Sequence, residues 1–199
     1  MECRSVGDKD PRLSLGGQNM PLSPRNANTM WMLHFLSHLK EGGTAGFVMA
    51  SGELSNGDTA RLEVRKTLVE QDYVDCIVQL TNQLFANTPI PCSLWFLAKH
   101  RGGDGRFRKR SSEILFVDAR TLGKLIQDSR RQKQLSEEDI AAICDVYHAF
   151  RIRSQASGSG LGQSAWRSRA GRHPHHVCAS LWRRASLSIP SGRYRRSAP

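Results

Sequence analysis

The 199-residue chain has no long apolar run, no closely paired cysteines and, after residue 150, no acidic side chain. No stretch of about 18 apolar residues is present, which excludes an apolar helix long enough to cross a membrane. Residues 1–17 lack the apolar centre that a secretory signal needs. Neither a membrane protein nor a secreted protein is expected from these features.

Cysteine usage points the same way. Five cysteines, an odd number, stand at positions 3, 76, 92, 144 and 178, and no two of them form a C-x-x-C pair. Cys76 and Cys92 lie inside apolar strand patterns, where cysteine behaves as a small hydrophobic residue. This distribution favours a reducing compartment over a disulfide framework. The expected location is the cytoplasm.

The net charge of +11 is located almost entirely in one segment. Residues 151–199 hold ten arginines and no lysine or acidic residue, whereas residues 1–150 hold all 18 acidic residues and the other 19 basic ones. A block of like charge without apolar periodicity is typical of a disordered extension. The Arg-, Ser- and Gly-rich composition is also typical of a GC-rich frame read out of register. We predict a frameshifted, disordered tail, with a functional basic arm as the alternative.

What is present is a segment from residue 26 to 150 in which short apolar runs alternate with helical patterns, the arrangement of an α/β sheet layer. Residues 1–25 are rich in Gly, Pro and Ser and are expected to be irregular. The predicted strands are Ala45–Ala50, Val74–Leu80, Cys92–Lys99 and Glu113–Asp118. The predicted helices are Thr29–Lys40 with Asn28 as N-cap, Ala60–Glu70, Thr121–Gln127, and a last one ending at Phe150.

Two local signals refine this assignment. The last helix opens with a capping box at residues 136–139, and its apolar stripe consists of Ile140, Ile143, Val146 and Tyr147. The second and third strands are separated by a loop of about ten residues, which is short for a helical crossover. These two strands are therefore expected to be antiparallel.

The loop QLFANTPIPCS is the most unusual stretch of the chain. It places Phe85, Asn87 and Thr88 beyond the end of one strand, and Pro89 and Pro91 stiffen the approach to the next. Ligands of open α/β sheets bind at the carboxyl ends of strands. The functional site is therefore expected in this loop.

Residues 26–150 resemble the methylation (modification) subunits of type I restriction–modification systems, which are S-adenosylmethionine-dependent DNA adenine-N6 methyltransferases. The matching pieces, in order, are NANTMWMLHFLSHLKEGGTAGFVMASGELS, EVRKTLVEQDYVDCIVQLTNQLFANTPIPCSLWFLAKH, EILFVDARTLG and LSEEDIAAICDVYHAFR. The resemblance implies the second half of a doubly wound methyltransferase sheet. It also implies S-adenosylmethionine as cofactor, DNA as substrate, and specificity and restriction subunits as partners.

Two motifs of that family are not found in this sequence. One is the glycine-rich F-x-G-x-G turn that holds the cofactor, and the other is the catalytic Asn-Pro-Pro-Phe segment. Residues 18–22 (QNMPL) depart from the latter at its second and fourth positions, and residues 158–162 (GSGLG) follow no predicted strand. We therefore expect no catalytic or cofactor-binding residue here, doubtful binding of S-adenosylmethionine, and no activity of the chain alone.

The resemblance gives Phe85 a role as the aromatic side chain that contacts a flipped adenine, because methylation of an exocyclic amine needs the base out of the duplex. Phe85 capping the sheet core is the alternative. Asn87 and Thr88 are candidates for the same contact, or they bond the loop backbone. Arg106, Arg108, Lys109 and Arg110, together with Arg101 in the same turn, are candidate phosphate contacts, or they form a solvated turn.

No metal site is expected. His34 and His38 are one helical turn apart but lack a third ligand in the sequence nearby, so a polar helix face is favoured. The cluster of His173, His175, His176 and Cys178 belongs to the tail predicted to be out of frame.

Three hypotheses of function follow. The first is a truncated methylation subunit that is inactive alone, and the second is one half of a split methyltransferase that needs the missing N-terminal half as partner. The third is a basic nucleic-acid-binding protein that acts through its Arg-rich tail. None of them gives the DNA target sequence or the oligomeric state.

Overall fold

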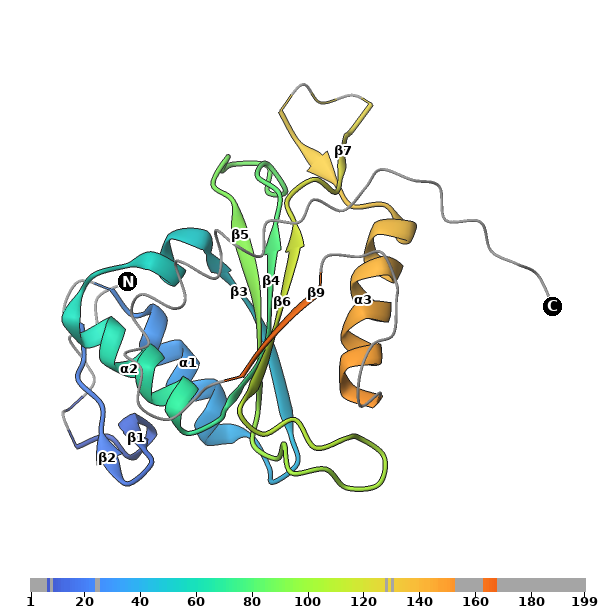
Figure 1. The fold of residues 1–199 in the computed structure, drawn as a ribbon. Coiled ribbons are helices and arrows are strands. Elements are labelled where there is room, and N and C mark those ends of the chain that lie inside the picture. Colours follow the sequence, from blue (N-terminus) through green and yellow to red (C-terminus); the bar gives the residue numbers. More distant parts are fainter. Residues whose placement is uncertain are drawn as a thin grey trace.

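The computed structural model describes residues 7, 9–23, 26–127, 129, 131–152 and, for the backbone alone, 163–167. Its centre is a five-stranded sheet with helices on both faces (Figure 1). Helices α1 (Asn28–His38) and α2 (Thr59–Glu70) cover one face, and α3 (Glu137–Ile152) covers the other. The α/β class expected from the sequence is confirmed. The strands lie in the order β3 (Thr44–Ala50), β5 (Cys92–Ala98), β4 (Val74–Leu80), β6 (Glu113–Ala119) and β9 (Gln163–Arg167).

The strand directions decide where loops gather. β5 is antiparallel to both β3 and β4, as expected for β4 and β5, and β4 is parallel to β6. β3, β4 and β6 therefore run the same way, and their carboxyl ends meet at one end of the sheet. The 3-10 helix η2 (Ser51–Ser55), the loop after β4 and the hairpin β7 (Lys124–Leu125) with β8 (Lys133–Gln134) all follow those ends.

Two apolar clusters fill the space on either side of the sheet. The first joins α1 and α2 to side chains such as Ile77, Trp95 and Leu97, and the second joins α3 to Val78, Leu115 and Val117. All seven residues of β4 are buried, since both of its faces are covered. The sequence shows this as an uninterrupted apolar run instead of an alternation.

Three local predictions are wrong, each for a tertiary reason. The N-cap of α1 is Ala27 and not Asn28, whose side chain instead donates to Glu53 Oε2 at 3.0 Å. Residues 121–127 form a turn and the short strand β7, because β8 pairs with them. Ile140 is half exposed, because α3 packs on the sheet through Ile143, Val146 and Tyr147. The capping box is confirmed: Ser136 Oγ accepts from Asp139 N, and Asp139 Oδ2 accepts from Ser136 N.

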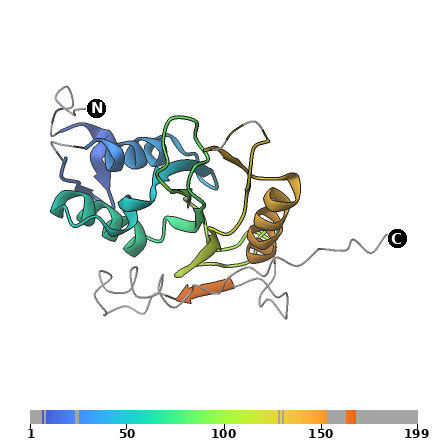
Figure 2. The same cartoon turned by 90° about the horizontal axis from the view of Figure 1, so that it is seen from above.

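Both ends of the chain were predicted to be irregular. At the N-terminal end the structure has the 3-10 helix η1 (Pro11–Leu13) and a two-residue hairpin of β1 (Ser14–Leu15) and β2 (Gln18–Asn19). In the tail, residues 163–167 form β9, which pairs antiparallel with β6 and departs from the predicted disorder (Figure 2). The rest of residues 153–199 lies outside the described residues. Within the described part, no helix is long and apolar enough to span a membrane.

Candidate functional site

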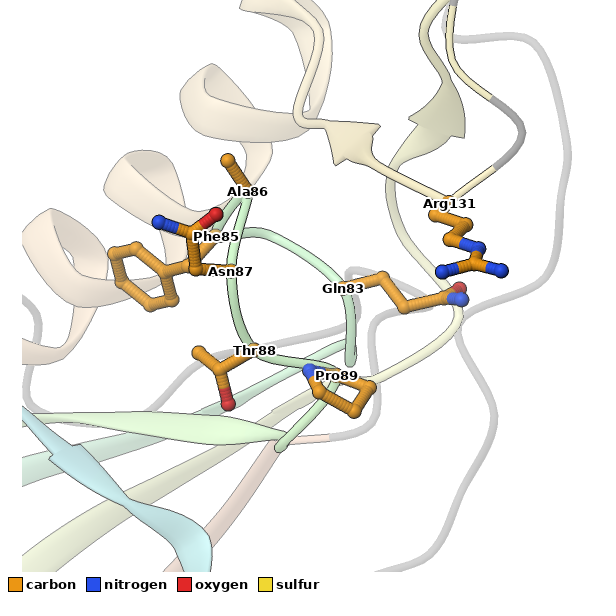
Figure 3. A pocket seen from close by; sticks show the side chains of 7 residues that line it. All are labelled: Gln83, Phe85, Ala86, Asn87, Thr88, Pro89 and Arg131. Carbon is orange, nitrogen blue, oxygen red and sulfur yellow. The ribbon is translucent and has the colours of Figure 1, made fainter.

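The loop after β4 encloses an open hollow of about 500 Å³ at the carboxyl end of the sheet (Figure 3). It is the place where a ligand of an α/β sheet is expected. Six of its lining residues come from the loop and one comes from the β7–β8 hairpin. They are Gln83, Phe85, Ala86, Asn87, Thr88, Pro89 and Arg131.

Phe85 is 47% exposed, which excludes the interpretation that it caps the sheet core. Its neighbour Leu84 makes that contact instead and packs against the apolar cluster under α3. The loop is narrow at this point, because Thr88 N donates to Phe85 O at 3.4 Å and the two residues form an isolated bridge. A large aromatic ring is thus held at the rim of the hollow with much of its surface open to solvent.

The two polar candidates of the loop differ in their freedom. Thr88 Oγ1 accepts a hydrogen bond from Ile90 N at 3.3 Å and thereby stabilises the loop backbone. The Asn87 side chain is exposed and forms no hydrogen bond with any other described residue. Its amide can both donate and accept, which suits the edge of a nucleobase.

Gln83 has an unusual backbone for its residue type. Its φ is +62°, a left-handed conformation that costs a residue with a Cβ about 1 kcal/mol. In that conformation its carbonyl accepts from Lys133 N at 2.8 Å. Strained backbone of this kind gathers at functional loops and is retained where the surroundings fix it.

Arg131 lies at the edge of the hollow and was not predicted from the sequence. Its side chain is exposed, and within the described residues it forms no ion pair. The signal that could have found it is the basic run RRQK at residues 130–133, which follows a strand pattern after a turn.

The basic turn at residues 100–112 lies at the opposite end of the sheet from Phe85, because β5 carries the chain there (Figure 1). A seven-residue strand spans roughly 20 Å. Arg106 and Lys109 are exposed there. They remain candidate phosphate contacts, but at a site separate from the loop.

Two other arginines of this turn are structural, which corrects the prediction for them. Arg110 is 2% exposed and its Nε donates to Asp75 Oδ1 at 3.0 Å. Arg108 donates to Phe150 O at 2.6 Å and forms an ion pair with Glu113 at 2.8 Å. Neither guanidinium is available to a phosphate.

Asp75 is the centre of this structural cluster. It is fully buried and also accepts from Arg101 Nε at 3.1 Å and from Tyr147 Oη at 2.8 Å. Arg101 is 3% exposed, so its prediction as a phosphate contact is wrong as well. A bulge in β4 between Val74 and Cys76 turns Asp75 toward α3. Burial and the Asp75 charge raise the pKa of Tyr147 far above its ordinary value, so its hydroxyl remains a donor.

The described residues do not fit S-adenosylmethionine. No F-x-G-x-G turn follows any of their strands, since Gly102, Gly103 and Gly105 follow β5 at the opposite end of the sheet, and two carboxylates near the carboxyl ends are held in ion pairs. Glu53 in η2 forms ion pairs with Arg61 and Arg65, and Asp118 pairs with Arg120. Residues 158–162 lie outside the described residues.

Two other candidate segments, residues 18–22 and the pair His34 and His38, lie in the described part of the chain. In residues 18–22, Gln18 and Asn19 form β2 and Met20 is buried in the core, at the far end of the sheet from Phe85 (Figure 1). His34 and His38 lie ring to ring, with centroids 4.3 Å apart, on α1. The described part of the chain contains no group of three side chains able to hold a metal ion. His173, His175, His176 and Cys178 lie outside it.

The fold is similar to that of solved methyltransferase subunits. The family model for N-6 DNA methylases matches residues 6–166, and the chain therefore belongs to this family.

Its relatives are methylase subunits of type I restriction enzymes. The chain is 43% identical over 150 residues to the MjaIX subunit of Methanocaldococcus jannaschii and covers 25% of it, with 75% of the chain aligned. It is 36% identical over 143 residues to the HindI subunit of Haemophilus influenzae, covering 29% of it with 71% of the chain. The methyltransferase subunit of a type I system from Streptococcus thermophilus has 26% identity and a TM-score of 0.57, over 71% of this chain and 27% of that one. The chain thus spans about a quarter of the length of these relatives.

Proposed function

We propose that this chain is part of a DNA adenine-N6 methyltransferase of a type I restriction–modification system, and that the loop after β4 contacts the flipped adenine. The single observation that carries the site is the exposed Phe85 ring at the rim of the hollow. Stacking of a base on an aromatic side chain is worth about 1–3 kcal/mol. Phe85 provides the face, and the Asn87 amide lies two residues away to meet the edge of the base.

The chain supplies only part of the reaction. The methyl group of S-adenosylmethionine is to be transferred to N6 of adenine, and the family places the acceptors of that amine in Asn-Pro-Pro-Phe. This sequence has neither that segment nor the glycine-rich turn. The proposed role of the chain is therefore to stack the base and to contact DNA, without methyltransferase activity by itself. Specificity and restriction subunits are its proposed partners, as in the type I systems of its relatives.

The stacking role is tested with a single-stranded oligonucleotide that carries 2-aminopurine in place of one adenine. Stacking on Phe85 quenches the fluorescence of 2-aminopurine. Phe85→Ala is expected to abolish this quenching and to lower the affinity for the oligonucleotide roughly tenfold or more. Phe85→Trp is expected to retain both. Ile90→Ala is the matched control, because Ile90 is 55% exposed in the same loop but does not line the hollow. Equal quenching by the wild-type chain and Phe85→Ala contradicts the proposal.

A split enzyme is the second candidate, and the outer edge of β3 favours it. In the described part of the chain β3 pairs only with β5, so its other edge is open. The face of α1 beside it is apolar, with Phe35 stacked on Phe47 at 5.1 Å and Trp31 43% exposed. An added strand from another polypeptide would cover both. Co-expression with the first half of a related subunit is expected to give a stable complex that methylates DNA, and free subunits without activity would exclude this candidate.

A further inference from the structure

The β7–β8 hairpin is fixed to the loop that carries Phe85. Lys133 Nζ donates to Thr81 Oγ1 at 3.1 Å and to Asn82 Oδ1 at 3.2 Å, and Lys133 N donates to Gln83 O. One lysine of β8 thus contacts three consecutive residues at the carboxyl end of β4. This attachment determines where Arg131, two residues earlier in the chain, can reach.

Arg131 and Phe85 lie on opposite sides of the loop. Figure 3 shows the Gln83 side chain directed toward the Arg131 guanidinium, whereas Phe85 and Asn87 point the other way. A base stacked on Phe85 therefore does not meet Arg131. A ligand on the Arg131 side would instead be a neighbouring part of the same DNA strand.

The local charge selects an anion there. Arg131 is the one charged residue among the seven described residues that line the hollow, and no acidic side chain is among them. Lys133 lies beside it and adds positive charge, although its own ammonium is engaged with Thr81 and Asn82. A guanidinium forms two parallel hydrogen bonds with a phosphate, and the Gln83 amide can add a third.

We propose that Arg131, assisted by Gln83, binds the backbone phosphate of the DNA strand next to the flipped nucleotide. This inference rests on the proposed function of the loop and extends it. The flipped base lies on Phe85 on one side of the loop. The DNA strand crosses to the other side, where Arg131 binds its phosphate. The left-handed Gln83 is the point at which the loop presents both an anchored carbonyl and a side chain aimed at Arg131.

The test is the salt dependence of binding of the full chain to a single-stranded oligonucleotide of about 12 nucleotides. Each phosphate contact contributes about 0.7 to the slope of log K against log salt. Arg131→Gln is expected to make this slope shallower by about 0.7, and Arg131→Lys is expected to retain it. Lys40→Gln is the charge-matched control, because Lys40 is exposed, precedes β3 at the opposite end of the sheet and is not a candidate phosphate contact. The ten arginines of residues 151–199 contribute equally to all variants.

The 2-aminopurine signal separates this inference from the proposed function. A slope unchanged by Arg131→Gln, or changed equally by Lys40→Gln, overturns the inference, even where quenching still depends on Phe85. A shallower slope for Arg131→Gln alone supports the phosphate contact. If quenching then proves independent of Phe85, the stacking role fails while the phosphate contact stands.

Discussion

Asp75 is the residue on which one end of the sheet depends. Its buried carboxylate meets two guanidinium groups and one hydroxyl, from Arg101, Arg110 and Tyr147. Removing one member of a buried ionic cluster leaves the others uncompensated, which costs far more than the net contribution of the cluster. The turn that looks basic in the sequence is therefore in large part a structural support.

We predict that Asp75→Asn lowers the free energy of unfolding by about 3–5 kcal/mol, because buried Arg110 loses its counterion and buried Arg101 keeps only the partly exposed Asp72. Tyr147→Phe is expected to cost only about 1 kcal/mol, since Asp75 keeps both arginines. Urea unfolding of the dilute chain, followed by tryptophan fluorescence, measures both. A loss below about 0.5 kcal/mol in Asp75→Asn contradicts the structural role assigned to this cluster.

Glu53 is a second residue with a marked electrostatic role. It is 1% exposed and accepts from Arg61 Nε at 2.9 Å and from Asn28 Nδ2 at 3.0 Å. Burial raises the pKa of Glu53, but the hydrogen bonds from Arg61 and Asn28 and the charges of Arg61 and Arg65 outweigh it. The pKa therefore lies below the ordinary value of 4.5.

Because the folded pKa of Glu53 lies below the unfolded one, its ionised form stabilises the fold above about pH 4.5, and this contribution is lost as pH falls through the folded pKa. We predict that the free energy of unfolding declines less between about pH 5 and pH 3 in Glu53→Gln than in the wild-type chain. Urea titrations at the two pH values measure the difference. An identical decline in both proteins would assign the acid sensitivity to other carboxylates.

Among the described elements, β3 has one edge whose backbone N–H and C=O groups are not paired with another strand. Lys99 N donates to Gly43 O and Ser51 N donates to Pro91 O, so the odd-numbered residues of β3 bond to β5. Thr44, Gly46, Val48 and Ala50 consequently direct N–H and C=O groups to the open edge. β3 contains no charged residue and no proline, the usual protections of an exposed edge.

We predict that the chain expressed alone self-associates or aggregates through β3 at micromolar concentration, and that Val48→Lys reduces this association. Val48 is 47% exposed, so the lysine is accommodated without disturbing the core. Sedimentation velocity measures the effect. Leu125→Lys is the control, because Leu125 is 56% exposed on β7. A monodisperse wild-type chain with a cooperative melting transition would show that the edge is covered in another way.

The β7–β8 hairpin is an element that the sequence pattern did not predict. Residues 121–127 have a helical pattern but form a turn and a strand, since a partner strand about eight residues later supplies the hydrogen bonds. By contrast, Val74–Leu80 was predicted with its observed bounds. A continuous apolar run bounded by polar residues leaves few alternatives, whereas a short polar segment adopts the structure its neighbours allow.

At the scale of the whole molecule, the chain spans about a quarter of the length of its relatives, and its sequence contains neither the F-x-G-x-G turn nor the Asn-Pro-Pro-Phe segment. We predict that the purified chain does not bind S-adenosylmethionine, because its sequence has no F-x-G-x-G turn and the carboxylates of Glu53 and Asp118, near the carboxyl ends of β3 and β6, are held in ion pairs. Isothermal titration calorimetry measures this directly. Binding in the micromolar range would contradict it, and a co-expressed complex with the first half of a related subunit serves as the positive control.

The sequence by itself determined the family, the α/β class and the loop of the candidate site. These depend on local features, namely apolar runs, a capping box and an uncommon loop, that leave their mark in consecutive residues. Phe85 and Asn87 were predicted in this way from their position after a strand, and both line the hollow.

Only the tertiary structure decided which charged residues were available. Arg106, Arg108, Lys109 and Arg110 look equivalent in the sequence, yet Arg110 is buried against Asp75, 35 positions earlier. Arg108 is partly buried and donates to the carbonyl of Phe150. Arg131 was not predicted as a site residue, yet the hydrogen bond of Lys133 to Thr81 holds the hairpin so that Arg131 lines the hollow. The physical reason is that the surroundings of a charge are set by residues distant in the chain, and they are defined only once the sheet has brought those residues together.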